Sequence, residues 1–183
     1  DILLKLSNFQ KKALKYSSLS SDPFGLDEKY LATIQKFLDF LCDDFCRVTV
    51  MGKENIPKNG RAIFVGNHAG FLPLDALVLL NTVRRYRNEP LKVRALFEDF
   101  FMNFPFIGTF LSRIGGIQGN FESAKKMLSN EMLVVNFPEG VLGISKPYSK
   151  RYQLQRFGRG GFIRLAYETK SPIVPVAIIG SEE

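Results

Sequence analysis

Residues 61–80 read RAIFVGNHAGFLPLDALVLL, and this stretch decides the fold class. Its first seven residues have the apolar pattern of a short strand that runs directly into His68, and a helical pattern begins at Asp75. Gly70 and Pro73 predict a shaped turn between the two, with Pro73 suited to the first turn of the helix. The order strand, turn, helix is typical of an α/β unit.

The same alternation continues along the chain. Strand patterns cover residues 47–52, 61–67, 93–98, 132–140 and 172–180, and helical patterns cover residues 27–45, 75–86, 101–114, 121–130 and 160–170, with a break at Pro105. Strands that alternate with helices predict an α/β domain with a largely parallel or mixed sheet flanked by helices. We expect this domain to span residues 46–183 and to follow an N-terminal helical segment, residues 1–45.

The N-terminal segment begins with an amphipathic pattern. Residues 2–16 place apolar side chains at helical spacing with lysines between them. Two interpretations stay open: a helix that packs on its own domain, or a helix that lies on a membrane surface. The sequence has no apolar run of transmembrane length and no signal-peptide pattern. Since it lacks a first methionine and stops just after a strand pattern, we expect a piece of a longer protein, with the α/β domain truncated at its C-terminus.

Charge and cysteine usage narrow the possible partners. The chain has 25 Lys and Arg against 18 Asp and Glu, a formal net charge of +7, which fits nucleic acid, anionic lipid or a phosphate-bearing small molecule. The single GRGG run opens a predicted helix, which disfavours nucleic acid. Cys42 and Cys46 are too few ligands for a metal site, and we expect both to be buried and reduced, as in a cytosolic protein.

His68 is the only histidine of the chain and follows the end of a predicted strand, where functional side chains gather in α/β sheets. An imidazole held by the carboxylate of Asp75 would be a general base. On a continuous helix, seven positions span ~10 Å, so this contact requires a non-helical bend. The chain has no Gly-x-Ser-x-Gly pattern, and we expect the base to activate a substrate hydroxyl or water directly. Three loops, after the strands that end near residues 67, 140 and 180, are expected to meet at one edge of the sheet.

Four blocks carry a resemblance to a known family. They are NHAGFLPLDALVLL (67–80), GGIQGN (115–120), NFPEGVLGISKPY (136–148) and PIVPVAIIG (172–180). In their order and separation they resemble the blocks of the glycerolipid acyltransferases, the PlsC-like lysophosphatidate and glycerol-phosphate acyltransferases, over about residues 45–183. The resemblance implies acyl transfer from a thioester of coenzyme A or acyl carrier protein to a hydroxyl of a glycerolipid or lysophospholipid. It also implies a direct attack without an acyl-enzyme.

The resemblance assigns roles to individual residues. It implies that His68 is the base and that Asp75 orients it, although the family's usual pattern has four residues between the two and this chain has six. Glu139 and Gly140 are expected to position the acceptor, and Pro175 to shape the donor side. No metal or other cofactor is implied, since acyl-CoA or acyl carrier protein serves as the co-substrate.

Basic residues bear on the choice of substrate. Residues 146–170 hold seven basic residues and one acid, which form either a solvated face or a binding surface for coenzyme A phosphates, a carrier protein or lipid head groups. Lys146 and Arg159 are the first candidates because they lie nearest the blocks. Many relatives have arginines where this chain has Asn120 and Val141, so a phosphorylated and an uncharged acceptor both stay open.

Six phenylalanines between residues 97 and 110 exceed the need of one core face, so some are expected to line an acyl-chain groove or to enter a bilayer surface. We therefore expect an enzyme bound peripherally to the cytoplasmic side of a membrane. Its partners would be the acyl donor, a lipid acceptor and the membrane surface, without nucleic acid. Two alternatives are a hydrolase in which His68 activates water to cleave a thioester or ester, and a non-catalytic module that binds acyl-CoA or lipid.

Overall fold

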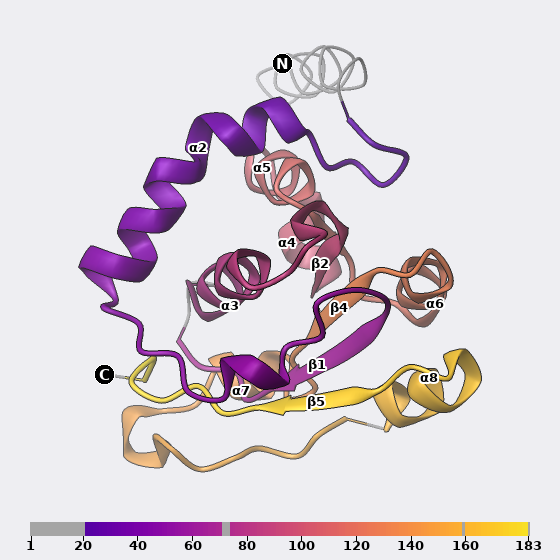
Figure 1. The fold of residues 1–183 in the computed structure, drawn as a ribbon. Helices are drawn as coiled ribbons and strands as arrows, with labels where there is room; N and C mark the ends of the chain where they lie inside the picture. Colours follow the sequence, from indigo (N-terminus) through magenta and orange to yellow (C-terminus); the bar gives the residue numbers. More distant parts are fainter. Residues whose placement is uncertain (1–20, 71–73, 159, 183) are drawn as a thin grey trace, which may run out of the picture.

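The computed structural model describes residues 21–70, 74–158 and 160–182. Its centre is a five-stranded sheet in the order β3-β2-β4-β1-β5, in which every neighbouring pair of strands is parallel (Figure 1). Helices alternate with the strands along the chain and cover both faces of the sheet. The predicted α/β class is confirmed, and the sheet is parallel throughout.

The described elements follow in chain order. The helices are α2 (Glu28–Phe40), α3 (Leu74–Arg85), α4 (Asp99–Asn103), α5 (Ile107–Arg113), α6 (Phe121–Ser129), α7 (Val141–Ile144) and α8 (Gly161–Thr169). The strands are β1 (Ala62–Gly66), β2 (Val93–Phe97), β3 (Gly116–Gln118), β4 (Leu133–Asn136) and β5 (Ile173–Val176). Short 3₁₀ turns cover Lys53–Asn55, Pro90–Lys92 and Tyr148–Lys150.

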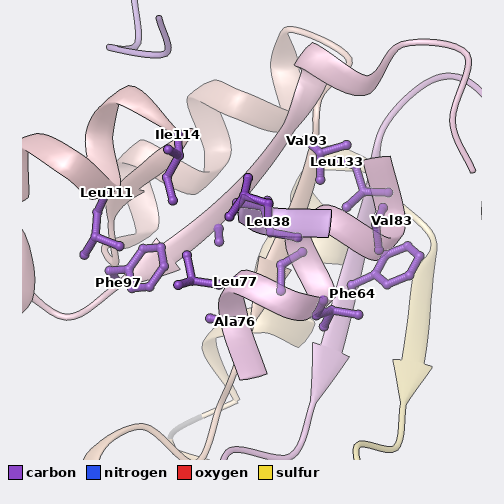
Figure 2. Packing of buried hydrophobic residues seen from close by; sticks show 14 of the residues in the cluster. Leu38, Phe64, Ala76, Leu77, Val83, Val93, Phe97, Leu111, Ile114 and Leu133 are labelled. Atoms are coloured by element: carbon purple, nitrogen blue, oxygen red, sulfur yellow. The ribbon is translucent and has the colours of Figure 1, made fainter. Parts of the chain in front are cut away.

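Successive side chains of the strands enter two separate hydrophobic cores. Phe64 of β1 belongs to the larger core with residues of α2, α3 and α5, whereas Ile63 belongs to the smaller core with residues of α6 and α8. Figure 2 shows the larger core, where Leu77 and Val83 of α3 pack with Phe64 and Leu133 of the sheet. β1 is buried at every position, as expected for a strand covered on both faces.

The described part of the N-terminal segment packs on this domain. Asp27 caps α2 by accepting the Tyr30 N–H at 3.0 Å, and it also forms an ion pair with Arg113 at the end of α5. Leu31 and Leu38 of α2 lie in the larger core. The predicted amphipathic helix over residues 2–16 lies outside the described residues.

A π-helical turn, Leu41–Phe45, extends α2 and changes which side chains are buried. Phe45, the last residue of this turn, is 61% exposed, because the wider turn shifts the angular position of the residues in it. The expectation of two buried cysteines is correct for Cys42 and wrong for Cys46, which is exposed.

The strand pattern was misleading at two places. Residues 47–52 alternate but form no strand, because Arg47 has a left-handed φ of 49° and the Val48 N–H bonds back to the Cys42 carbonyl at 2.8 Å. The short strand β3 was not predicted, since only its central residue is apolar. Among the described residues, no helix combines the length and apolar composition needed to cross a bilayer.

Candidate active site

His68 follows the end of β1, and Asp75 lies in the first turn of α3. His68 Nδ1 and Asp75 Oδ2 are 2.5 Å apart, so the predicted contact forms across the seven-residue separation. The Asp75 side chain is 0% exposed and that of His68 is 14% exposed. The N–H groups of Ala69 and Ala76 also donate to the Asp75 carboxylate, at 3.0 and 2.7 Å. The start of α3 thus fixes the carboxylate against the imidazole.

The contact determines which ring nitrogen is reactive. A carboxylate only accepts hydrogen bonds, so a neutral His68 ring donates from Nδ1 and keeps its lone pair on Nε2. The ring of Phe137 stacks on the imidazole, with centroids 4.5 Å apart and planes at 23°. A ring that is oriented at one nitrogen and has a lone pair at the other has the geometry of a general base.

Glu139, at the turn after β4, holds the backbone of His68. Its Oε1 accepts the His68 N–H at 2.9 Å, and its Oε2 accepts the Gln155 N–H at 2.7 Å. The residue is only 3% exposed. One buried carboxylate therefore joins the turn after β1 to the loop that precedes α8, and both of its oxygens contact the protein chain.

Asn67 joins the ends of β1 and β5. Its side-chain amide donates to the Ile178 carbonyl at 2.8 Å, and its side-chain oxygen accepts the Ile178 N–H at 2.7 Å. These two bonds extend the pairing of the strands beyond the last register pair, Gly66 with Val176. The residue directly before His68 is consequently fixed from the far end of the chain.

Lys146 lies in a buried group of charges. Its side chain is 6% exposed, its Nζ is 3.8 Å from Glu139 Oε2, and it forms an ion pair with Glu182. Glu182 also accepts the Tyr152 N–H. Burial raises the pKa of Glu182, but the hydrogen bonds from Lys146 and from the Tyr152 amide outweigh this effect and leave the pKa below its ordinary value. The protein's own carboxylates thus engage the Lys146 ammonium group.

A cleft with a cavity volume of about 80 Å³ opens beside His68. Its described lining comes from the carboxyl ends of β1 to β4 and from the helices that follow them: His68, Ala76, Leu96, Phe97, Glu98, Phe101, Gly119, Asn136, Phe137, Gly140 and Ile144. Parallel strands all end at the same edge of the sheet, which brings these segments together. Apolar side chains predominate, and the polar ones are His68, Glu98 and Asn136.

The structure brings together most of the predicted site residues: His68, Asp75, Glu139, Gly140 and Lys146. Gly140 lines the cleft with a positive φ of 53°. Pro175 is exposed in β5 opposite Val65 and is not among the described residues that line the cleft. Arg159 lies outside the described residues.

The sequence analysis missed the contributions of β2 and β3. Phe97 and Glu98 at the end of β2, and Gly119 after β3, line the same cleft as His68. For β2 the sequence does carry a signal, because functional side chains gather at the carboxyl end of every predicted strand and not only at the three whose loops were expected to meet. No strand pattern indicated β3, although Gly119 lies in the GGIQGN block (115–120) that carries the family resemblance.

Comparisons with known proteins agree with this arrangement. A family model described as Acyltransferase matches residues 47–179. An uncharacterized protein of Mycobacterium tuberculosis is 42% identical over 165 residues, which are 90% of this chain and 46% of that protein. One of Mycobacterium leprae is 40% identical over 163 residues, which are 88% of this chain and 44% of that protein. This chain therefore spans about half the length of these curated relatives.

A solved structure shares the fold. It is the crystal structure of the 1-acyl-sn-glycerophosphate acyltransferase PlsC from Thermotoga maritima, with a TM-score of 0.60 and 26% identity. The match covers 83% of this chain and 59% of that chain. Because the family model covers most of the sequence and the fold agrees, the chain belongs to the PlsC-like glycerolipid acyltransferase family.

Proposed function

We propose that this protein transfers a fatty acyl group from a thioester of coenzyme A or acyl carrier protein to a hydroxyl of a glycerolipid or lysophospholipid. The observation that carries the proposal is the 2.5 Å contact between His68 and Asp75 at the edge of the cleft. No serine, threonine or cysteine is among the described residues that line this cleft. This supports attack by the acceptor itself, without an acylated side chain.

The proposed step needs only His68 and the two substrates. Nε2 of His68 takes the proton of the acceptor hydroxyl as its oxygen forms a bond to the thioester carbon. The carbon–sulfur bond then breaks, and the leaving thiolate takes the proton back from the imidazolium. Asp75 stabilises the imidazolium while it exists, and Phe137 and Glu139 hold the ring and the backbone in place.

The substrate-binding roles follow from position. Gly140 lies in the cleft wall, and this position supports its proposed role in placing the acceptor. Glu139 is proposed to act on the position of the base, because its carboxylate accepts the backbone N–H of His68. Exposed basic residues of the segment 146–170, such as Lys150 and Arg151, are proposed to contact the donor's phosphates together with Arg159. The proposed role of Pro175 on the donor side rests only on the resemblance of the block 172–180 to the family's fourth block.

The proposed association with the cytoplasmic face of a membrane is supported in one part, because exposed aromatic side chains suit contact with a membrane surface. Phe101 lines the cleft, and Phe100, Phe104 and Phe106 of the same stretch are 68%, 45% and 57% exposed. Large apolar side chains next to a site for lipid substrates are typical of surfaces that enter the head-group region of a bilayer.

Product analysis tests the proposed reaction. Purified protein is given radiolabelled acyl-CoA or acyl carrier protein with a panel of glycerolipid acceptors, and the lipid products are separated. We expect label in an acylated acceptor. Free fatty acid without acylated acceptor would identify a hydrolase, and tight donor binding without any turnover would identify a binding module; both results contradict the proposal.

A further inference from the structure

The charged residues that line the cleft bear on whether the acceptor is charged. The described lining holds one carboxylate, Glu98, and one carboxamide, Asn136, and it holds no lysine or arginine. The chain as a whole carries a formal net charge of +7. The lack of a cation in the described lining is therefore a local property of the cleft and does not follow from composition.

The buried cation Lys146, next to Glu139, does not make the site positive. Lys146 is engaged by Glu139 and Glu182, so these three groups together carry one formal negative charge. Asp75 adds another when His68 is neutral, as a general base must be. Neither the Lys146 group nor the His68–Asp75 pair therefore supplies an unbalanced positive charge.

Glu98 places a carboxylate at the wall of the cleft. The residue directly follows β2, and a Cβ atom added at Gly140 would lie 3.2 Å from Glu98 Oε1. No ion pair joins Glu98 to a lysine or arginine of the described residues. A carboxylate of this kind accepts hydrogen bonds from hydroxyl groups and repels phosphate.

On the basis of the proposed acyl transfer at His68, we infer that the acceptor is an uncharged diol lipid of the monoacylglycerol type. One hydroxyl reaches Nε2 of His68, and the second donates a hydrogen bond to Glu98. The apolar side chains of Leu96, Phe97 and Phe101 line the same cleft and suit the hydrocarbon chain. A phosphomonoester would bring two further negative charges into this cleft.

An acceptor comparison tests the inference with the wild-type protein. Initial rates are measured with monoacylglycerol, diacylglycerol and lysophosphatidate in identical mixed micelles, with acyl-CoA and acyl carrier protein both tried as donors. We expect kcat/KM for monoacylglycerol to exceed that for lysophosphatidate by at least about tenfold. Diacylglycerol, which has only one hydroxyl, should fall below monoacylglycerol. An equal or higher kcat/KM for lysophosphatidate or for diacylglycerol overturns the inference and leaves the proposed transfer intact, whereas acylation of no acceptor overturns both.

Two variants test whether residues of the cleft cause the preference for monoacylglycerol over lysophosphatidate. Glu98→Gln removes the negative charge, and Val141→Arg adds a positive charge next to Gly140 at a residue that is 56% exposed. Each should raise the ratio of lysophosphatidate to monoacylglycerol turnover at least about fivefold. Glu54→Gln, an exposed residue on a turn before β1, is the control and should leave the ratio unchanged. An unchanged ratio in Glu98→Gln overturns the inference. A loss of lysophosphatidate turnover in an Arg159→Gln variant, which would show that Arg159 binds the phosphate, also overturns it.

Discussion

Asp75 receives three hydrogen bonds, from the ring of His68 and from the N–H groups of Ala69 and Ala76, and both of its oxygens are used. The start of α3 therefore orients the carboxylate, and the carboxylate orients the imidazole. An asparagine at this position would keep the shape but would place an amide N–H₂ group against at least one of these donors.

For Asp75→Asn we expect kcat to fall about 100-fold or more with little change in the donor KM, because the amide neither fixes the ring nor stabilises the imidazolium. Steady-state kinetics measure the change, and circular dichroism shows whether the variant is folded. Asp44→Asn, at an exposed carboxylate on the turn after α2, is the matched control. A folded Asp75→Asn protein with kcat within twofold of the wild type would show that Asp75 does not orient the base.

Glu139 is a second buried carboxylate whose oxygens both accept backbone N–H groups. Glutamine would leave one of these N–H groups facing an N–H₂ group, so we expect Glu139→Gln to lower the free energy of unfolding by about 1–3 kcal/mol. We also expect a lower kcat, since the His68 backbone loses its anchor. Thermal unfolding and kinetics, with the exposed Glu122→Gln as control, measure both effects. No change in either quantity would contradict the positioning role.

Helix α7 is short, yet it packs directly against the site. A Cβ atom added at Gly143 would lie 2.8 Å from the Cβ of His68 and 2.9 Å from its carbonyl oxygen. These distances are shorter than real contacts between such atoms, so either α7 or the turn after β1 has to move. The position of α7 and the position of the base are thus coupled.

Gly143→Ala should therefore reduce kcat at least about tenfold, since small displacements of a catalytic group are costly. Gly161→Ala is the matched control, because nothing lies within 4 Å of the added Cβ at the start of α8. We expect the control to keep wild-type activity. Equal activities of the two variants would show that the turn tolerates the methyl group.

The helices and strands differ in how well local patterns predict them. β1 and β4 are apolar and buried, and α3 and α6 carry a clear apolar face, so their sequences alone indicate them. The segment 47–52 alternates equally well but has no strand partner, because a left-handed Arg47 turns it back to Cys42. Pairing depends on distant residues, and a local pattern does not contain that information.

At the scale of the whole domain, the sequence predicts some contacts of the site and leaves others undetermined. The strand-end rule predicted that His68 and Glu139 would meet, and a chemical argument linked His68 to Asp75. The same rule brings the loop after residue 180 to this edge, but it does not show that Glu182 of that loop pairs with Lys146, because side-chain pairing depends on the packed structure. The strand-end rule also brings Glu98 to this edge, but its place in the same cleft as His68 depends on the strand order, which puts β2 beside β4 and which no local pattern gives.

The exposed phenylalanines of α4 and the segment after it allow a test of membrane association. We expect the double variant Phe100→Ser/Phe104→Ser to bind anionic vesicles at least about tenfold more weakly, because two large apolar side chains no longer enter the bilayer surface. Vesicle co-sedimentation measures the affinity. Ile163→Ser, at a residue of α8 that is 59% exposed, is the control for loss of surface hydrophobicity. Equal binding by the two variants would place the membrane contact elsewhere.

The most direct test of His68 as the base is acyl transfer by His68→Gln compared with the wild type, with labelled acyl-CoA or acyl carrier protein as the donor and a preferred acceptor. The glutamine side chain fills part of the space of the imidazole but has no basic nitrogen. We expect the transfer rate to fall at least about 100-fold while the donor still binds with near wild-type affinity. A rate within threefold of the wild type would contradict the role of His68 as the general base.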